Sequence, residues 1–168
     1  MEIISRTYTD DGAIPNNAKL PVIMYRAVFT GAEALRPETY EELFHRNRWD
    51  GCWRNGLFKY HHYHSTAHEA LGIYGGWADA LLGGEQGDKF RIEAGDIILL
   101  PAGTGHKNLG IGSKLQVVGA YPDGQYPDMN YGYPGERPHV LENIAAVPLP
   151  SRDPVEGLRG PVFTMWRG

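Results

Sequence analysis

The sequence has a single cysteine, no long apolar segment and no cluster of basic residues. Because Cys52 is alone, no intrachain disulfide can form, and a reducing, cytoplasmic setting is expected. We read Cys52 as a small buried hydrophobe rather than a nucleophile. No stretch approaches the roughly 18 apolar residues of a membrane helix, and the N-terminus does not resemble a signal peptide. The net charge of -4, without a basic run, argues against a nucleic-acid partner.

Helical signals are scarce, whereas turn residues are abundant. The 168 residues suit one domain over 1–168, and 22 glycines and 12 prolines separate short apolar runs, which favours an all-β fold. One helix is expected over 36–49, with Pro37 in its first turn and Gly51 as its stop signal. The segment 83–88 resembles a hairpin turn, and the chain after Tyr121 is expected to be an irregular extension. Strands are expected near 20–29, 57–64, 68–74, 77–82, 88–92, 96–100, 114–121 and 160–166.

Four of the seven histidines lie between positions 61 and 68, directly before Glu69. If this segment is a strand, alternation places His62 and His64 on the inner face and His61 on the outer face. Two buried imidazoles need several polar partners, and a buried carboxylate is costly unless it is paired or bound to metal. Imidazole and carboxylate together suit divalent Fe, Mn, Ni or Zn.

Other interpretations of this segment are weaker. Histidines in a core are often simply hydrogen-bonded, and that alternative stays open for each one taken singly. A zinc-protease helix would need a second histidine where Gly72 stands. Ser65 lies beside the histidines, but the G-x-S-x-G elbow of a serine nucleophile is missing.

The spacing of these residues resembles the two motifs of the cupin superfamily. The first motif, G-x5-H-x-H-x4-E-x6-G, begins at Gly56 and ends at Gly76. The second, G-x5-P-x-G-x2-H-x3-N, begins at Gly95 and reaches His106. Its final asparagine departs from the pattern, because Asn108 follows His106 after one residue instead of three. The resemblance covers about residues 56–121.

The resemblance implies a double-stranded β-helix, the jelly-roll barrel of cupins, here with one N-terminal helix and an irregular C-terminal extension. It also implies one divalent transition metal ion, held by His62, His64, Glu69 and His106. The residues alone had pointed to the first three, and only the family pattern adds His106. His68 lies outside the motif, and we expect it behind the metal ligands, at the pocket rim or simply exposed, while His61 is expected at the surface.

Two classes of function follow from this interpretation. The first is a metal-dependent enzyme acting on a small organic molecule, with dioxygenase-type chemistry slightly ahead of isomerase or lyase chemistry. The second is a non-catalytic module that binds or senses a metal or a small ligand. A homodimer is expected because 20–29 is apolar on both faces. Candidate pocket residues are the inward positions Phe58, Tyr60, Leu71 and Ile73.

Overall fold

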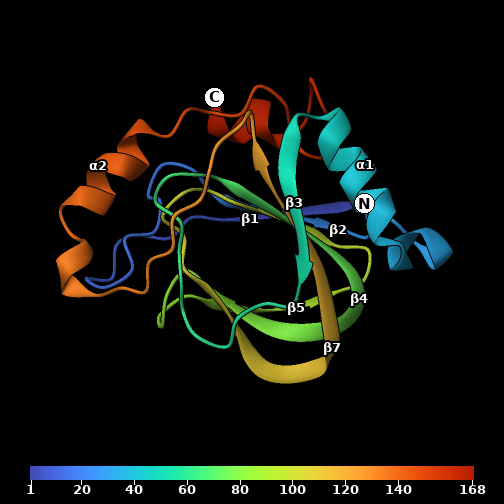
Figure 1. Ribbon diagram of the computed structural model, residues 1–168, viewed down its shortest axis with the longest axis horizontal. Helices are drawn as coiled ribbons and strands as arrows, with labels where there is room; N and C mark the ends of the chain where they lie inside the picture. The colour runs from blue at the N-terminus through green and yellow to red at the C-terminus, as the bar shows by residue number, and fades with distance from the viewer.

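Two long antiparallel strands, β4 (Glu69–Leu82) and β7 (His106–Pro122), run through the centre of the computed structural model, which describes residues 1–168 (Figure 1). They belong to one seven-stranded antiparallel sheet in the order β1-β2-β6-β4-β7-β3, with β5 also paired to β4. The sheet curls into a barrel, so the predicted all-β jelly roll is confirmed. The remaining strands are β1 (Glu2–Arg6), β2 (Val22–Arg26), β3 (Trp49–Asn55), β5 (Asp88–Glu93) and β6 (Ile97–Leu100).

Alternation along the strands divides the apolar side chains between two cores. On β4, Leu71 and Ile73 belong to one buried cluster, whereas Ala70 belongs to the other. The first cluster fills the barrel, and the second lies against α1 (Pro37–Arg46), whose Tyr40 and Phe44 are fully buried. Both faces of the sheet are therefore covered within the chain.

A second helix, α2 (His139–Ala146), lies on the flank of the barrel opposite to α1 (Figure 1). The expectation of a single helix is therefore wrong. Sequence pattern missed α2 because it is short and buries only Val140 fully. The other helical segments are single turns: η1 (Gly31–Leu35), η2 (Pro134–Glu136) and η3 (Val162–Trp166). None of the helices combines the length and apolar character needed to span a membrane.

Several expected element boundaries are wrong. The strands expected at 68–74 and 77–82 are one strand, β4, and the glycines between them produce shifts in its pairing with β7. The strand expected at 160–166 is the π-helical turn η3. The helix ends at Arg46, and Gly51 is no stop signal but part of a bulge in β3, where its φ is 68°. β1 and β3 were not expected.

The segment 57–64 is extended but is not a regular strand. Its bridges are isolated, His62 with His106 and Tyr63 with Asn130, and single backbone hydrogen bonds from Asn108 and Gly103 also hold it. Its alternation still turns His62 and His64 inward. On the opposite face Lys59 is exposed, but His61 is largely covered and Tyr63 packs in a buried cluster with Ile14 and Val140. The flanking parts of the chain therefore cover the expected outer face from His61 onward.

Two other expectations change once the neighbours of each strand are known. Strand β2 lies between β1 and β6, and Val22 to Tyr25 are buried within the protomer. Its apolar pattern therefore does not require a second copy, and the homodimer stays a prediction. Cys52 is exposed on β3, so the expectation of a buried cysteine is wrong.

Candidate metal centre

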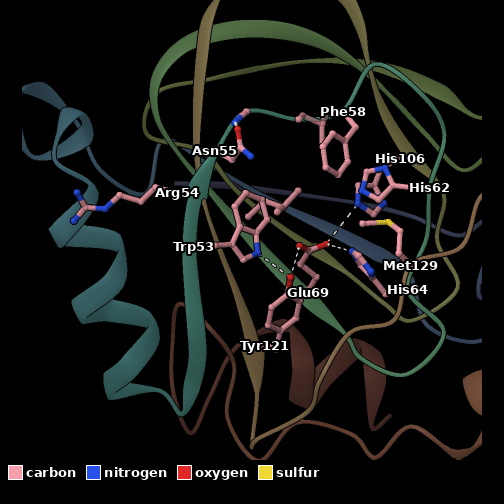
Figure 2. A pocket seen from close by; sticks show the side chains of 13 residues that line it. Trp53, Arg54, Asn55, Phe58, His62, His64, Glu69, His106, Tyr121 and Met129 are labelled. Atoms are coloured by element: carbon pink, nitrogen blue, oxygen red, sulfur yellow. Dashed lines mark hydrogen bonds and ion pairs between the residues drawn. The ribbon is translucent and has the colours of Figure 1, made fainter.

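The structure brings His62, His64, Glu69 and His106 together at one end of the barrel (Figure 2). Glu69 is the first residue of β4, and His106 is the first residue of β7. The bridge between His62 and His106 joins their backbones, with His106 N–H donating to the His62 carbonyl at 3.1 Å. All four side chains are buried, and the three histidines offer ring nitrogens within 4.8 Å of one another.

Backbone carbonyls hold the three imidazoles in one tautomer. The Nδ1 atoms of His62, His64 and His106 face the carbonyls of Tyr60, Asp128 and Thr104 at 3.4, 2.6 and 3.0 Å respectively. A carbonyl only accepts hydrogen bonds, so each Nδ1 carries the proton. In a neutral ring Nε2 then presents a lone pair, which is the arrangement that metal-binding histidines use.

Glu69 places one carboxylate oxygen among these nitrogens. Its Oε2 lies 3.0 Å from His64 Nε2 and 3.4 Å from His106 Nε2. When both rings are neutral and protonated at Nδ1, this buried Oε2 has no hydrogen-bond donor. Three ring nitrogens and an unsatisfied buried oxygen around one point match the ligand set of a divalent transition metal ion. The residues present therefore fit such an ion.

The electrostatics of the cluster depend on the same contacts. Burial, with His106 and His64 nearby, lowers the pKa of His62 to about 2. Burial also acts to lower the pKa of His64, but the Glu69 carboxylate outweighs it and raises that pKa to about 9. Although burial acts to raise the pKa of Glu69, its contacts with His64 and His106 hold that pKa well below its usual range. Without a cation, His64 therefore carries the proton that balances Glu69.

The second oxygen of Glu69 is fixed by two aromatic residues. Trp53 Nε1 can only donate, and it donates to the Tyr121 hydroxyl at 2.8 Å. Tyr121 therefore points its own proton at Glu69 Oε1, 3.3 Å away (Figure 2). This chain of two hydrogen bonds satisfies Oε1 and leaves Oε2 directed at the histidines.

We expect Tyr121→Phe to weaken metal binding by about tenfold, because loss of a hydrogen bond behind a metal ligand typically has an effect of this size. Competition with a chromophoric chelator measures the affinity. Tyr126→Phe is the matched control, since it removes the hydroxyl of a tyrosine that is 85% exposed. Equal affinities for the two variants would show that the Tyr121 hydroxyl does not orient Glu69.

His64 is also held by the loop that follows β7. The Asp128 carbonyl accepts from His64 Nδ1, and the Asp128 carboxylate accepts from the Ser65 N–H at 2.6 Å and from the Ser65 hydroxyl. Asn143 of α2 donates to Ser65 Oγ at 3.1 Å. Ser65 is therefore fully buried and bound in this network, which gives it a structural role.

Above the four residues lies a cavity of about 230 Å³. Of the expected pocket residues, Phe58 and Leu71 line it, but Ile73 belongs to the core and Tyr60 lies in a separate hollow with Tyr131 and Tyr133. Those two expectations are wrong because alternation does not distinguish pocket from core or surface. The other apolar lining residues, which sequence pattern did not reveal, are Trp53, Leu57 and Met129.

The two remaining histidines of the segment lie outside the metal cluster. His61 is not at the surface as expected, because its side chain is 8% exposed and its Nδ1 lies 2.8 Å from Glu85. His68 is neither at the rim nor exposed. Its Nδ1 accepts from the Ala102 N–H at 2.9 Å, its ring packs against Trp166, and burial lowers its pKa to about 4.

Two motif glycines are required by the backbone. Gly76 has a φ of 65°, and a Cβ there would lie 1.9 Å from the Ser113 carbonyl oxygen. Gly95 has a φ of 105°, and a Cβ would lie 2.4 Å from the Phe29 carbonyl oxygen. Asn108, the residue that departs from the motif, donates its N–H to the Phe58 carbonyl and so helps to hold the histidine segment.

Comparison with known proteins places the chain in a family. It is 36% identical over 168 residues to the uncharacterized protein YjlB of Bacillus subtilis (strain 168), and the match covers 99% of both chains. The chain belongs to the YjlB family. No model of a known protein family matches the sequence.

Solved structures similar to this YjlB-family protein include a DUF861 family protein and RmlC. A DUF861 family protein from Thermotoga maritima is 26% identical, with a TM-score of 0.33, over 49% of this chain and 88% of its own. RmlC from Streptococcus suis, solved with dTDP-D-xylose, is 15% identical, with a TM-score of 0.38, over 82% of this chain and 75% of its own. The YjlB-family protein combines two cupin-like sequence motifs with a jelly-roll barrel, and it has a buried group of three histidines that could bind a metal ion.

Proposed function

We propose that this YjlB-family protein is a metal-dependent enzyme that binds one divalent ion through His62, His64, Glu69 and His106 and acts on a small organic molecule. The observation that carries the proposal is that ring nitrogens of three buried histidines lie within 4.8 Å of one another, with the buried Glu69 Oε2 3.0 Å from His64 Nε2 and 3.4 Å from His106 Nε2. Fe, Mn, Ni and Zn all suit this ligand set.

A bound ion would supply Lewis-acid polarisation of a substrate oxygen or activation of dioxygen. The protein contributes the orientation of the four ligands, through the backbone carbonyls and the Tyr121 hydroxyl. The apolar cavity walls exclude water from a bound molecule, which strengthens every electrostatic interaction inside.

The cavity lacks a free general base. Apart from the four candidate ligands, its titratable side chains are Arg54 and Tyr121. Arg54 is bound to Glu41 at 2.6 Å, and burial together with the Glu69 carboxylate raises the pKa of Tyr121 far above neutrality. Isomerase and lyase reactions usually need a positioned base, so this lining favours metal-centred oxygen chemistry of the dioxygenase type.

The same lining supports the second candidate function, a non-catalytic module that binds a metal or a small ligand. Turnover decides between the two. The protein is reconstituted with Fe(II), Mn(II), Ni(II) or Zn(II), and product formation and oxygen uptake are followed across a panel of small organic compounds. Activity that survives in the His62→Ala and His106→Ala double variant would contradict the proposed mechanism, and a metal-loaded protein without turnover would favour the binding module.

We expect metal binding to release about one proton at neutral pH. His64 has a pKa raised to about 9 by Glu69, so it is protonated in the metal-free protein, and the metal must displace that proton. His62, with its pKa lowered to about 2, has none to lose. Metal affinity should therefore fall by up to about tenfold for each unit by which the pH lies below the pKa of His64. Calorimetry in buffers of different ionisation enthalpy measures the released protons, and a value near zero would contradict this charge assignment.

A further inference from the structure

The cavity above the candidate metal site has apolar walls. Trp53, Leu57, Phe58, Leu71 and Met129 contribute them, from β3, β4 and the loops on either side of the site. Phe58 and Met129 are 40% and 41% exposed, which is high for large apolar side chains beside a cavity. A ligand with an apolar body would cover them, and the removal of this area from water would favour binding.

The cavity holds no cationic side chain that is free to bind a ligand. Arg54 lies at its edge but points away toward α1, as Figure 2 shows. Its guanidinium is held by Glu41 at 2.6 and 3.1 Å and lies 3.5 Å from Glu38. Lys107, on β7, is bound to Glu85 at 2.7 Å and is not among the lining residues. Phosphate groups in proteins are usually held by Arg, Lys or helix N-termini, and this cavity presents none of them.

One neutral polar group remains at the cavity. The Asn55 Oδ1 accepts from the Gly56 N–H at 2.8 Å, while its Nδ2 makes no hydrogen bond in the structure. Asn55 therefore offers an amide NH2 group, with two N–H donors and no formal charge. The size of the cavity, about 230 Å³, corresponds to the space of about seven or eight water molecules, so it limits the ligand to a small molecule.

From these features we propose that the cavity takes an uncharged small molecule in which a metal-binding oxygen pair is joined to a compact apolar body, and that it discriminates against phosphorylated and nucleotide-linked compounds. This inference rests on the proposed function, because the oxygen pair needs the metal ion. The apolar body would lie between Trp53, Phe58 and Met129, and Asn55 Nδ2 would donate to a neutral acceptor on it.

Three hydroxamates that share one metal-binding head and differ in their bodies test the inference: acetohydroxamate, benzohydroxamate and phosphoglycolohydroxamate. Each is titrated into the metal-loaded protein while tryptophan fluorescence is followed, to which Trp53 at the cavity contributes, and metal content is measured before and after. We expect benzohydroxamate to bind at least about tenfold more tightly than acetohydroxamate, because its ring buries apolar area. Phosphoglycolohydroxamate should bind no more tightly than acetohydroxamate.

Two variants connect the selectivity to the walls. Phe58→Ala should weaken benzohydroxamate by several-fold and leave acetohydroxamate nearly unchanged, whereas Met129→Lys should strengthen phosphoglycolohydroxamate by about tenfold. Phe58 and Met129 are partly exposed, so both variants are expected to fold.

The outcomes separate this inference from the proposed function. Preference of the unmodified, metal-loaded protein for phosphoglycolohydroxamate overturns the inference and leaves metal binding intact. Equal affinities for acetohydroxamate and benzohydroxamate overturn it as well. A protein that retains no metal overturns the proposed function itself, and the inference fails with it.

Discussion

Replacing His106 with alanine is expected to abolish stoichiometric metal binding and to raise the apparent Kd by at least about 100-fold. His106 contributes one of three ring nitrogens that lie within 4.8 Å of one another, and its Nε2 also lies 3.4 Å from Glu69 Oε2. A structural zinc site binds with roughly 10–16 kcal/mol, so each of four ligands accounts for about 2.5–4 kcal/mol on average. Removing one ligand therefore costs about as much as, or more than, the roughly 2.7 kcal/mol that a 100-fold change represents.

Metal content after dialysis and competition with a chromophoric chelator measure this effect. His139→Ala is the matched control, because the His139 side chain is 79% exposed on α2, away from the cluster. Circular dichroism shows whether the barrel is retained, which the backbone bridge between positions 62 and 106 favours. If His106→Ala kept full metal content, the histidine cluster would not be the metal site.

The two halves of this candidate site differ in how far sequence could lead to them. His62, His64 and Glu69 lie within eight positions of one another, so alternation and the high cost of a buried carboxylate point to them directly. His106 is reached only through the cupin spacing, because its place beside His62 depends on a bridge between distant segments. A local sequence pattern carries no information about a contact between segments so far apart in the chain.

The residues that orient Glu69 could not be found from sequence at all. Trp53 meets Tyr121 because β3 and β7 pair with a shifted register at the Gly51 bulge. A one-residue change in that register would turn their side chains to the other face. Register across such a distance follows from packing of the whole barrel, and β3 itself was not expected.

Sequence pattern also did not indicate that the flanking segments cover the barrel. The chain after Tyr121 supplies the Asp128 carbonyl that holds His64 and the helix that covers Tyr63. Irregular backbone rich in proline and glycine carries no periodicity, so its contacts are invisible to pattern analysis. Its anchoring in the core can nevertheless be tested directly.

Asp153→Ala is expected to destabilise the protein by about 3–5 kcal/mol, because a fully buried carboxylate at the centre of several hydrogen bonds would be lost. Asp153 accepts from the Tyr25 hydroxyl at 2.7 Å and from the N–H groups of Val155, Glu156 and Val162 at 2.9, 3.0 and 3.1 Å. Without it, these four buried or half-buried donors have no partner. The loss corresponds to a decrease in Tm of roughly 10 °C for a chain of this size.

Asp10→Ala is the matched control, because Asp10 also ties the C-terminal extension to the rest of the chain, through Arg137 at 2.7 Å, but with its side chain 41% exposed. An exposed ion pair contributes about 0–1 kcal/mol, so this variant should melt within a few degrees of the unmodified protein. Thermal melting followed by circular dichroism compares the two. A similar Tm for both variants would mean that the extension is not anchored through Asp153, and that the cover over the histidine segment is held by the Asp128 and Ser65 network instead.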